Sequence, residues 1–229
     1  MLRDAGKDNP YCRFNIGSMA TLKHEGIREE LLKFHKENYS SNLMSLVVYN
    51  SAPVETLEQW VREDFNSIQN FERGEPPLPS PYAGMTAGVL YKVVPVRSSR
   101  SLSLYWTLPR LFDKYPSRAP DYLSHLIGHE GENSLLSLLK KKNLATELSA
   151  GTASAYMFNS FGLFVCSVDL TQEGLENYET VLEIIYAYVN MLKDHGIQEW
   201  VYEECRDLAN YQYKFKDKSP PISTCVNLA

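Results

Sequence analysis

The sequence has only four cysteines, and no two of them are spaced as a CxxC pair. Cys12, Cys166, Cys205 and Cys225 lie far apart, which disfavours a disulfide framework and favours reduced thiols in a cytoplasmic compartment. We expect Cys166 and Cys205 to act as small apolar core residues. The first ten residues are polar and lack an apolar segment, so no secretory signal is predicted.

Long apolar runs and an excess of positive charge are also missing. No run reaches the roughly 18 apolar residues of a transmembrane helix, so no membrane partner is expected. Lys and Arg number 23 against 28 Asp and Glu, a net charge of −5, which removes the electrostatic basis for binding nucleic acid. With 229 residues, 44% of them hydrophobic, the chain is long enough for two small domains or one large one.

Common catalytic motifs do not occur either. There is no Gly-x-Ser-x-Gly, phosphate loop or dinucleotide fingerprint. None of the five histidines lies in His-Glu-x-x-His or His-x-x-Glu-His, which zinc peptidases use to place two imidazoles and a general base on one helical face. Cys205 has acidic neighbours that raise a thiol pKa, so it is a poor nucleophile. The sequence therefore predicts no catalytic and no metal residues in this chain.

The clearest boundary is a segment with four prolines between residues 73 and 81. Prolines fix φ and remove backbone donors, so neither a helix nor a central strand continues through it. We expect a first domain part at residues 1–73, a linker at 74–81 and a second domain at 82–229.

In the first part, the apolar spacing predicts a helix over residues 27–39, a buried strand over 43–49, and a helix capped by Ser51. A single strand cannot form a sheet, so this part has the character of the end of a larger domain.

In the second part, composition and periodicity predict strands and helices in a mixed order. Two strands, at residues 89–96 and 101–107, are expected to form a hairpin. Thr171 is expected to cap the longest helix, which Gly196 ends, and the last helix is expected to turn Trp200, Val201, Cys205 and Leu208 inward. The remaining expected elements are helices at residues 119–129, 133–142 and 197–215 and strands at 148–158 and 162–169. This order predicts an α+β fold, with helices packed on one face of an antiparallel sheet.

The densest polar cluster is His125, His129, Glu130 and Glu132 at the end of the helix over residues 119–129. In one interpretation one histidine is a hydrogen-bonded core residue and the other caps the helix break. Two further interpretations are a ligand-binding site and a divalent ion held by His125, His129 and Glu132.

Seven segments, in order along the chain, resemble the insulin-degrading enzyme family, the large inverted-zincin (insulinase or pitrilysin-type) metallopeptidases. They are residues 28–35 (REELLKFH), 39–44 (YSSNLM), 90–96 (LYKVVPV), 125–131 (HLIGHEG), 168–174 (VDLTQEG), 198–201 (QEWV) and 215–218 (FKDK). The resemblance implies the end of the first, catalytic-type domain and most of a second, noncatalytic domain. It also implies that the zinc motif lies in a longer parent protein.

In this family the second domain binds the N-terminus of a peptide at an exosite, where the peptide adds as a strand to a sheet edge. The resemblance carries the ammonium-binding carboxylate to Glu130, flanked by His125, Gly128 and His129. It carries the edge strand to four consecutive residues, Leu148, Ser149, Ala150 and Gly151. Two departures stand out: a glycine-proline-glycine turn of the family is Gly131-Glu132-Asn133 here, and its Leu-Val-Gly-Gly edge is Leu148-Ser149-Ala150-Gly151.

The leading hypothesis is therefore a part of a zinc metalloendopeptidase that binds peptides with a free N-terminus but does not cleave them on its own. No cofactor is expected in this chain, and zinc is expected in a full-length parent. The alternative is a noncatalytic structural or regulatory homologue that acts as a dimerisation partner. The partners expected in either case are the missing metallopeptidase domains or a second copy of the chain.

Overall fold

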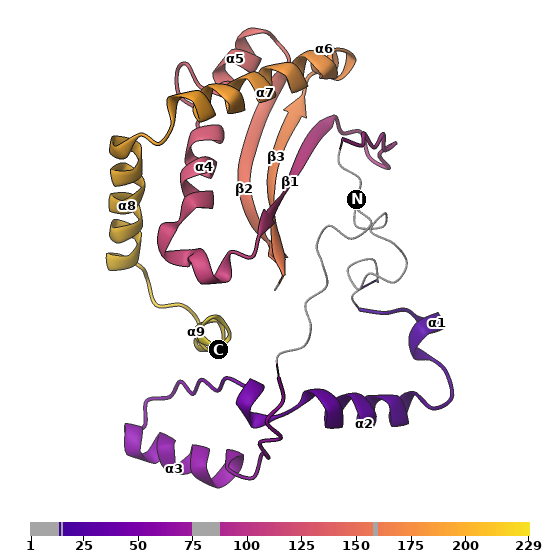
Figure 1. Ribbon diagram of the computed structural model, residues 1–229, viewed down its shortest axis with the longest axis vertical. Helices are drawn as coiled ribbons and strands as arrows, with labels where there is room; N and C mark the ends of the chain where they lie inside the picture. The colour runs from indigo at the N-terminus through magenta and orange to yellow at the C-terminus, as the bar shows by residue number, and fades with distance from the viewer. Residues whose placement is uncertain (1–13, 15, 75–87, 158–159) are drawn as a thin grey trace. The chain divides into compact units, whose positions relative to one another are not determined.

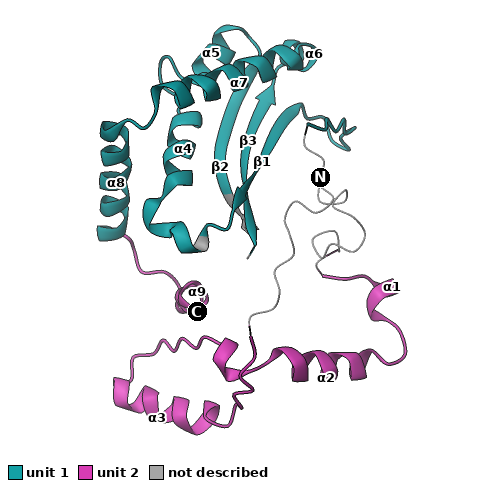
Figure 2. Ribbon diagram, viewed as in Figure 1, with its two compact units in different colours: residues 1–6, 78–215 teal, residues 7–77, 216–229 magenta. Residues whose placement is uncertain are grey.

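The computed structural model describes residue 14 and residues 16–74, 88–157 and 160–229. The chain divides into two compact units, one of residues 1–6 and 78–215 and the other of residues 7–77 and 216–229 (Figure 2). Apart from Gly74, the predicted linker lies outside the described residues. Within the described part, no helix is both long and apolar enough to cross a membrane.

The first unit is built on an antiparallel sheet of β1 (Ser101–Pro109), β2 (Ala145–Met157) and β3 (Phe161–Leu170). The strand order is β1-β3-β2, so β3 is central and β1 and β2 are the edge strands (Figure 1). Strands β2 and β3 follow one another in the sequence, and Ala150 lies opposite Cys166. The predicted strands at residues 101–107, 148–158 and 162–169 are confirmed, with bounds shifted by a few residues.

Helices cover this sheet, and the main core lies between them and alternate residues of the strands (Figure 1). From β3, Phe164, Cys166, Val168 and Leu170 are buried, as the two-residue period of a strand requires. The helices of the unit are η4 (Phe112–Ser117), α4 (Ala119–Ile127), α5 (Leu135–Lys141), α6 (Gln172–Glu176), α7 (Tyr178–His195) and α8 (Glu199–Lys214). The predicted α+β fold is confirmed.

Local capping chemistry fixes where several of these helices begin and end. The Thr171 hydroxyl accepts a hydrogen bond from the Gly174 N–H, and the Ser134 hydroxyl accepts one from the Ser137 N–H. Gly196, with φ of 66°, follows the end of α7. Thr171 caps a helix as predicted, but that helix is the short α6 and not the longest one. The expected single helix is two, because Asn177 (φ −112°, ψ 35°) interrupts it between α6 and α7.

The predicted hairpin of residues 89–96 with 101–107 is wrong. Residues 89–96 form no strand, and Val93, Val94 and Val96 are 82%, 91% and 104% exposed. Pro95 lacks the N–H that a ladder needs, and β1 pairs with β3 instead. Strand composition alone does not make a strand where no neighbour pairs with it.

The second unit consists of α1 (Met19–Leu22), α2 (Ile27–Asn38), η3 (Ser41–Leu43), α3 (Val54–Phe65) and α9 (Pro221–Leu228). Helix α2 confirms the prediction for residues 27–39. The predicted strand at 43–49 is wrong: Met44 is extended (φ −109°, ψ 140°), but these residues pair with no strand in the described part. Pro53, and not Ser51, occupies the N-cap of α3.

In the second unit, hydrogen bonds join two segments that are about 30 residues apart in sequence. They lie around Ser40, the one described residue of this unit that is fully buried. The Ser40 hydroxyl accepts a hydrogen bond from the Phe71 N–H at 2.9 Å, and the Asn42 side chain donates to the Arg73 carbonyl at 2.7 Å. The Ser41 N–H donates to the Gln69 carbonyl at 3.1 Å. Hydrogen bonds hold these two segments together, because the described part of this unit buries no large apolar side chain.

The predicted inward face of α8 is only partly correct. Val201 is buried and Cys205 is half-buried, but Trp200 is 67% exposed and Leu208 is 48% exposed. The apolar spacing predicted the helix correctly, but fewer of its apolar side chains are buried than that spacing predicts.

Candidate functional site

The candidate site lies where the end of α4 meets edge strand β2. Helix α4 packs against β2, and Gly128 caps its C-terminal end. A Cβ atom placed on Gly128 would lie 3.7 Å from the amide nitrogen of Ala150 and 3.8 Å from its carbonyl oxygen. Since glycine has no side chain, the end of α4 can approach the backbone of Ala150 this closely.

The other candidate residues surround this contact. His125 is half-buried on α4, and His129 and Glu130 are exposed in the turn after it. On β2, Leu148 is buried, Ser149 is exposed, and Ala150 and Gly151 are half-buried. The structure thus brings the cluster at residues 125–130 and the strand at 148–151 to one edge of the sheet.

A serine that the sequence analysis did not single out holds the two elements together. The Ser124 hydroxyl on α4 donates a hydrogen bond to the Ala150 carbonyl oxygen at 2.5 Å. Gly151, with φ of 154°, leaves room for it, since a Cβ there would lie 2.8 Å from Ser124 Oγ. Ser124 lies four residues before Gly128, on the same helical face, and this spacing is the one sequence signal that could have indicated it.

The rings of His125 and His129 lie near each other but are not stacked. Their ring centroids are 6.0 Å apart, with an interplanar angle of 61°. His129 Nδ1 accepts a hydrogen bond from the Gly131 N–H at 3.1 Å, which requires that nitrogen to be unprotonated. His129 therefore organises the turn after α4, as the capping interpretation predicts for one of the two histidines.

A divalent ion at His125, His129 and Glu132 is not supported. Within the described residues, no group of three or more His, Cys, Asp and Glu side chains is arranged to hold a metal ion. Glu130 and Glu132 are both exposed on either side of Gly131. Glu130 and Glu132 therefore make the turn after α4 negatively charged, beside the edge of β2. The side chains of His125, His129 and Glu132 do not form a zinc site.

The cysteines whose structure is described show no sign of activation. Cys166, Cys205 and Cys225 are free thiols. Burial raises the pKa of Cys166 to about 11. Burial, followed by the carboxylates of Glu204 and Asp121, raises the pKa of Cys205. A thiolate nucleophile is disfavoured at both positions, as the sequence predicts for Cys205.

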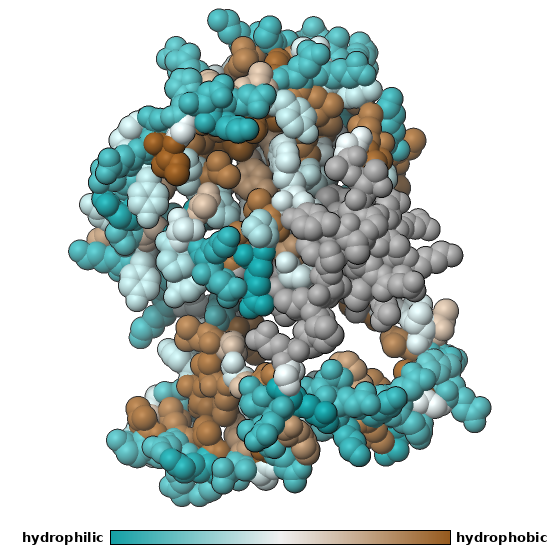
Figure 3. Space-filling model, viewed as in Figure 1, coloured by the Kyte–Doolittle hydropathy of each residue, from teal (hydrophilic) through white to brown (hydrophobic). Residues whose placement is uncertain are grey.

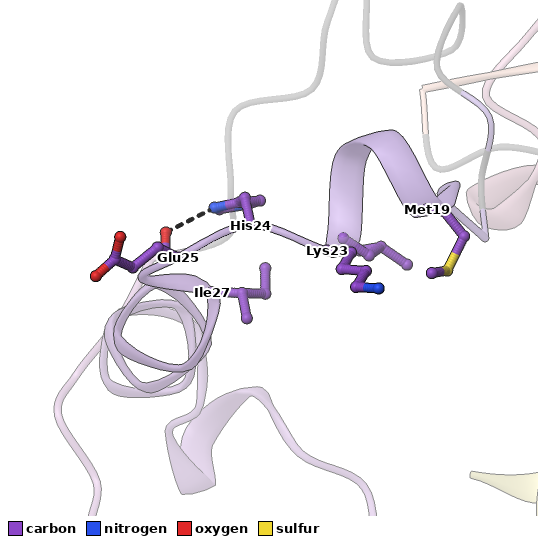
Figure 4. Close-up of a pocket in the computed structure, with 6 residues that line it drawn as sticks. Met19, Lys23, His24, Glu25 and Ile27 are labelled. Carbon is purple, nitrogen blue, oxygen red and sulfur yellow. Dashed lines mark hydrogen bonds between the residues drawn. The ribbon is translucent and has the colours of Figure 1, made fainter.

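A separate hollow of about 510 Å³ lies on the second unit, between α1 and the start of α2 (Figure 4). Its lining consists of Met19, Leu22, Lys23, His24, Glu25 and Ile27. The His24 ring hydrogen-bonds the Glu25 carbonyl at 2.9 Å, and most of the lining is exposed to solvent. None of the candidate residues on α4 and β2 takes part in it.

Comparison with known proteins identifies relatives over most of the chain. Residues 26–208 match the family model described as the peptidase M16 inactive domain. The insulin-degrading enzyme of Drosophila melanogaster is 39% identical over 95% of this chain and 22% of its own length. The A-factor-processing enzyme of Saccharomyces cerevisiae is 39% identical over 96% of the chain and 22% of its own length. The chain thus spans about a fifth of the length of these relatives.

Solved structures share the fold. A crystal structure of pitrilysin matches 93% of this chain and 23% of its own chain, with a TM-score of 0.80 at 23% identity. A protease from Helicobacter pylori matches 93% of this chain and 50% of its own, with a TM-score of 0.57 at 21% identity. The matched family model and the relatives confirm the predicted resemblance: the chain belongs to the M16 peptidase family, that of the insulin-degrading enzymes.

Proposed function

We propose that this chain is part of a zinc metalloendopeptidase that degrades peptides, and that its α4–β2 edge binds the N-terminal end of a peptide without cleaving it. The observation that carries the proposal is the position of β2. It is an edge strand with β3 on one side, and the end of α4 lies beside its Ala150.

An edge strand presents backbone N–H and C=O groups that another strand can pair with. A peptide that adds to β2 would be held mainly by backbone hydrogen bonds, which are available to almost any sequence. This mode suits a protein that binds peptides of varied sequence. The small residues Ser149, Ala150 and Gly151 leave space beside the strand for the side chains of such a peptide.

Selection for a free N-terminus would come from the turn after α4. Glu130 is exposed close to Gly128, and its carboxylate would attract a peptide ammonium group. Glu132 adds a second carboxylate two residues later. Because both groups are exposed, we expect each charge to contribute modestly.

Hydrolysis would belong to the longer protein. The zinc ion and its ligands are expected outside this chain, because the described residues offer no metal-binding group and no activated thiol. Free thiols at the described cysteines favour a cytoplasmic location for the protein.

The binding role is tested with one peptide in two forms, with a free and with an acetylated N-terminus. Glu130→Gln should weaken binding of the free form by about 2- to 5-fold and leave the acetylated form unchanged, as expected for an exposed ion pair. Glu183→Gln, an exposed carboxylate on α7, is the matched control and should change neither. Equal losses for both forms of the peptide would reject the ammonium role of Glu130.

The absence of cleavage is tested on the same chain. We expect metal analysis to find no stoichiometric zinc, and a fluorogenic peptide to show no turnover that a chelator abolishes. Stoichiometric zinc together with chelator-sensitive turnover would contradict the proposal that this chain binds without cleaving.

A second candidate function, a structural partner in an assembly, is favoured by the apolar surface of the second unit (Figure 3). Its helices leave large apolar side chains exposed, among them Leu31 at 61%, Phe34 at 56% and Trp60 at 44%. Exposed apolar faces of this kind mark interaction surfaces. Light scattering over a range of concentrations separates the two roles: a tight oligomer that ignores peptide favours assembly, and a monomer that binds peptide excludes it.

A further inference from the structure

We infer that Ser124 weakens strand addition at β2, because its hydroxyl already donates a hydrogen bond to the Ala150 carbonyl that an added peptide strand would use. The inference rests on the proposed function of the α4–β2 edge. Its basis is the hydrogen bond from Ser124 Oγ to the Ala150 carbonyl oxygen.

The Ala150 carbonyl belongs to the edge of β2 that does not pair with β3. In an antiparallel strand the N–H and C=O of one residue point to the same side, and successive residues alternate. Both polar backbone atoms of Ala150 lie within 4 Å of a Cβ position built on Gly128, so both face the end of α4. Helix α4 packs against β2, whereas β3 pairs with β2 on its other side (Figure 1).

The position of the Ser124 hydroxyl is set by its neighbours. The Ser124 carbonyl accepts the N–H of Gly128 at 2.8 Å in the last turn of α4, which holds the serine on the helix. Gly151 presents only hydrogen atoms to the hydroxyl, since a Cβ there would come within 2.8 Å of Oγ. The hydroxyl therefore lies at the carbonyl oxygen that the N–H of an added strand would use.

This exchange of donors lowers the gain from peptide binding. A peptide N–H that bonds to Ala150 competes with the hydroxyl for the carbonyl oxygen, so part of the gain from the new hydrogen bond is lost. Without the hydroxyl, that competition is absent. From the usual net contribution of one hydrogen bond, we expect Ser124→Ala to tighten peptide binding by about 2- to 10-fold.

The test measures binding of an Ala-Val-Lys repeat peptide, with a free N-terminus and a fluorescein at its C-terminus, by fluorescence anisotropy. A series of peptides carries one backbone N-methyl group at each successive position, which removes one N–H at a time. Ser124→Ala should bind the parent peptide more tightly. N-methylation at a single position should cost Ser124→Ala several-fold more affinity than it costs the unsubstituted chain.

Two further variants separate this role from a change in helix stability. Ser124→Thr keeps the hydroxyl donor and should show the N-methyl pattern of the unsubstituted chain. Ser117→Ala also removes a hydroxyl that donates to a backbone carbonyl, that of Lys114 at 2.8 Å, but it lies in η4 and should change no affinity.

The outcomes separate the effect of Ser124 from peptide binding itself. If the unsubstituted chain binds the peptide, and Ser124→Ala has the same affinity and the same N-methyl pattern, Ser124 does not weaken strand addition and the proposed function stands. If neither chain binds any peptide of the series, the proposed function fails and the role of Ser124 fails with it.

Discussion

Replacing Gly174 by alanine tests the contact that joins α6 to the start of β2. A Cβ there would lie 1.8 Å from the Leu144 carbonyl oxygen and 2.8 Å from its carbonyl carbon. Ordinary contact begins near 3.4 Å, so the backbone of α6 or of Leu144 must move by about 1.6 Å. Backbone on both sides leaves no flexible side chain to absorb this movement.

The movement would break two hydrogen bonds as well as the packing. Leu144 accepts the N–H of Thr171 at 3.2 Å, and the Gly174 N–H donates to the Thr171 hydroxyl at 2.9 Å. Loss of the cap costs about 1 kcal/mol, one backbone hydrogen bond about 1 kcal/mol and overpacking about 1–3 kcal/mol. We therefore expect Gly174→Ala to lower the free energy of unfolding by about 3–5 kcal/mol, the sum of these three costs.

Urea unfolding followed by circular dichroism measures this loss. Thr171→Ala removes the cap and the hydrogen bond from the Thr171 hydroxyl to the Asn143 carbonyl, without the overpacking, and should cost about 2 kcal/mol, which makes it the internal reference. Gly74→Ala, where a Cβ would meet nothing within 4 Å, should stay within about 0.5 kcal/mol of the unsubstituted chain. A Gly174→Ala variant as stable as the Gly74→Ala control would refute the close approach of α6 to Leu144.

Two further predictions concern the core of the first unit. Burial raises the pKa of Cys166 from 9.0 to about 11, so the unfolded chain ionises first and the free energy of unfolding should fall by roughly 2–3 kcal/mol as pH rises from 9 to 11. Urea unfolding at a series of pH values checks this, and a Cys166→Ala variant with the same pH dependence would contradict it. Ile185→Ala on α7, fully buried, should cost about 2–5 kcal/mol, whereas Ile197→Ala, 82% exposed, should cost less than about 0.5 kcal/mol. Equal losses for the two isoleucine variants would contradict the placement of α7 over the sheet.

Elements with strong local signals were predictable from the sequence. The apolar period of α7 and the capping hydroxyl of Thr171 act within a few residues, so the sequence alone contains them. Strands β2 and β3 follow one another in the sequence and pair with each other. The segments at residues 89–96 and 43–49 also have a composition typical of strands, yet neither forms one. A strand needs a partner strand, and residues far away in the sequence decide whether one is there.

For the candidate site, too, the sequence indicates local features but not contacts between residues that are far apart in the chain. The roles assigned to the residues at 125–130 and 148–151 rest on the resemblance to a family, because the periodicity of a sequence does not indicate which carboxylate binds a peptide. Ser124 was missed since its importance depends on Ala150, 26 residues later in the chain. Helix α9 was not predicted because it begins at Pro220 and Pro221. Prolines usually mark a place where a helix cannot continue, whereas proline also fits the first turn of a helix.

Addition of a peptide strand to β2 is tested by hydrogen exchange of single backbone amides, measured by NMR with and without peptide. On binding, exchange should slow at Ala150 and at its alternate neighbours Leu148 and Thr152, whose N–H groups lie on the side of β2 away from β3. Amides of the opposite edge strand, β1, should exchange as before. Unchanged exchange along β2 at saturating peptide, or protection along β1 instead, would contradict the account.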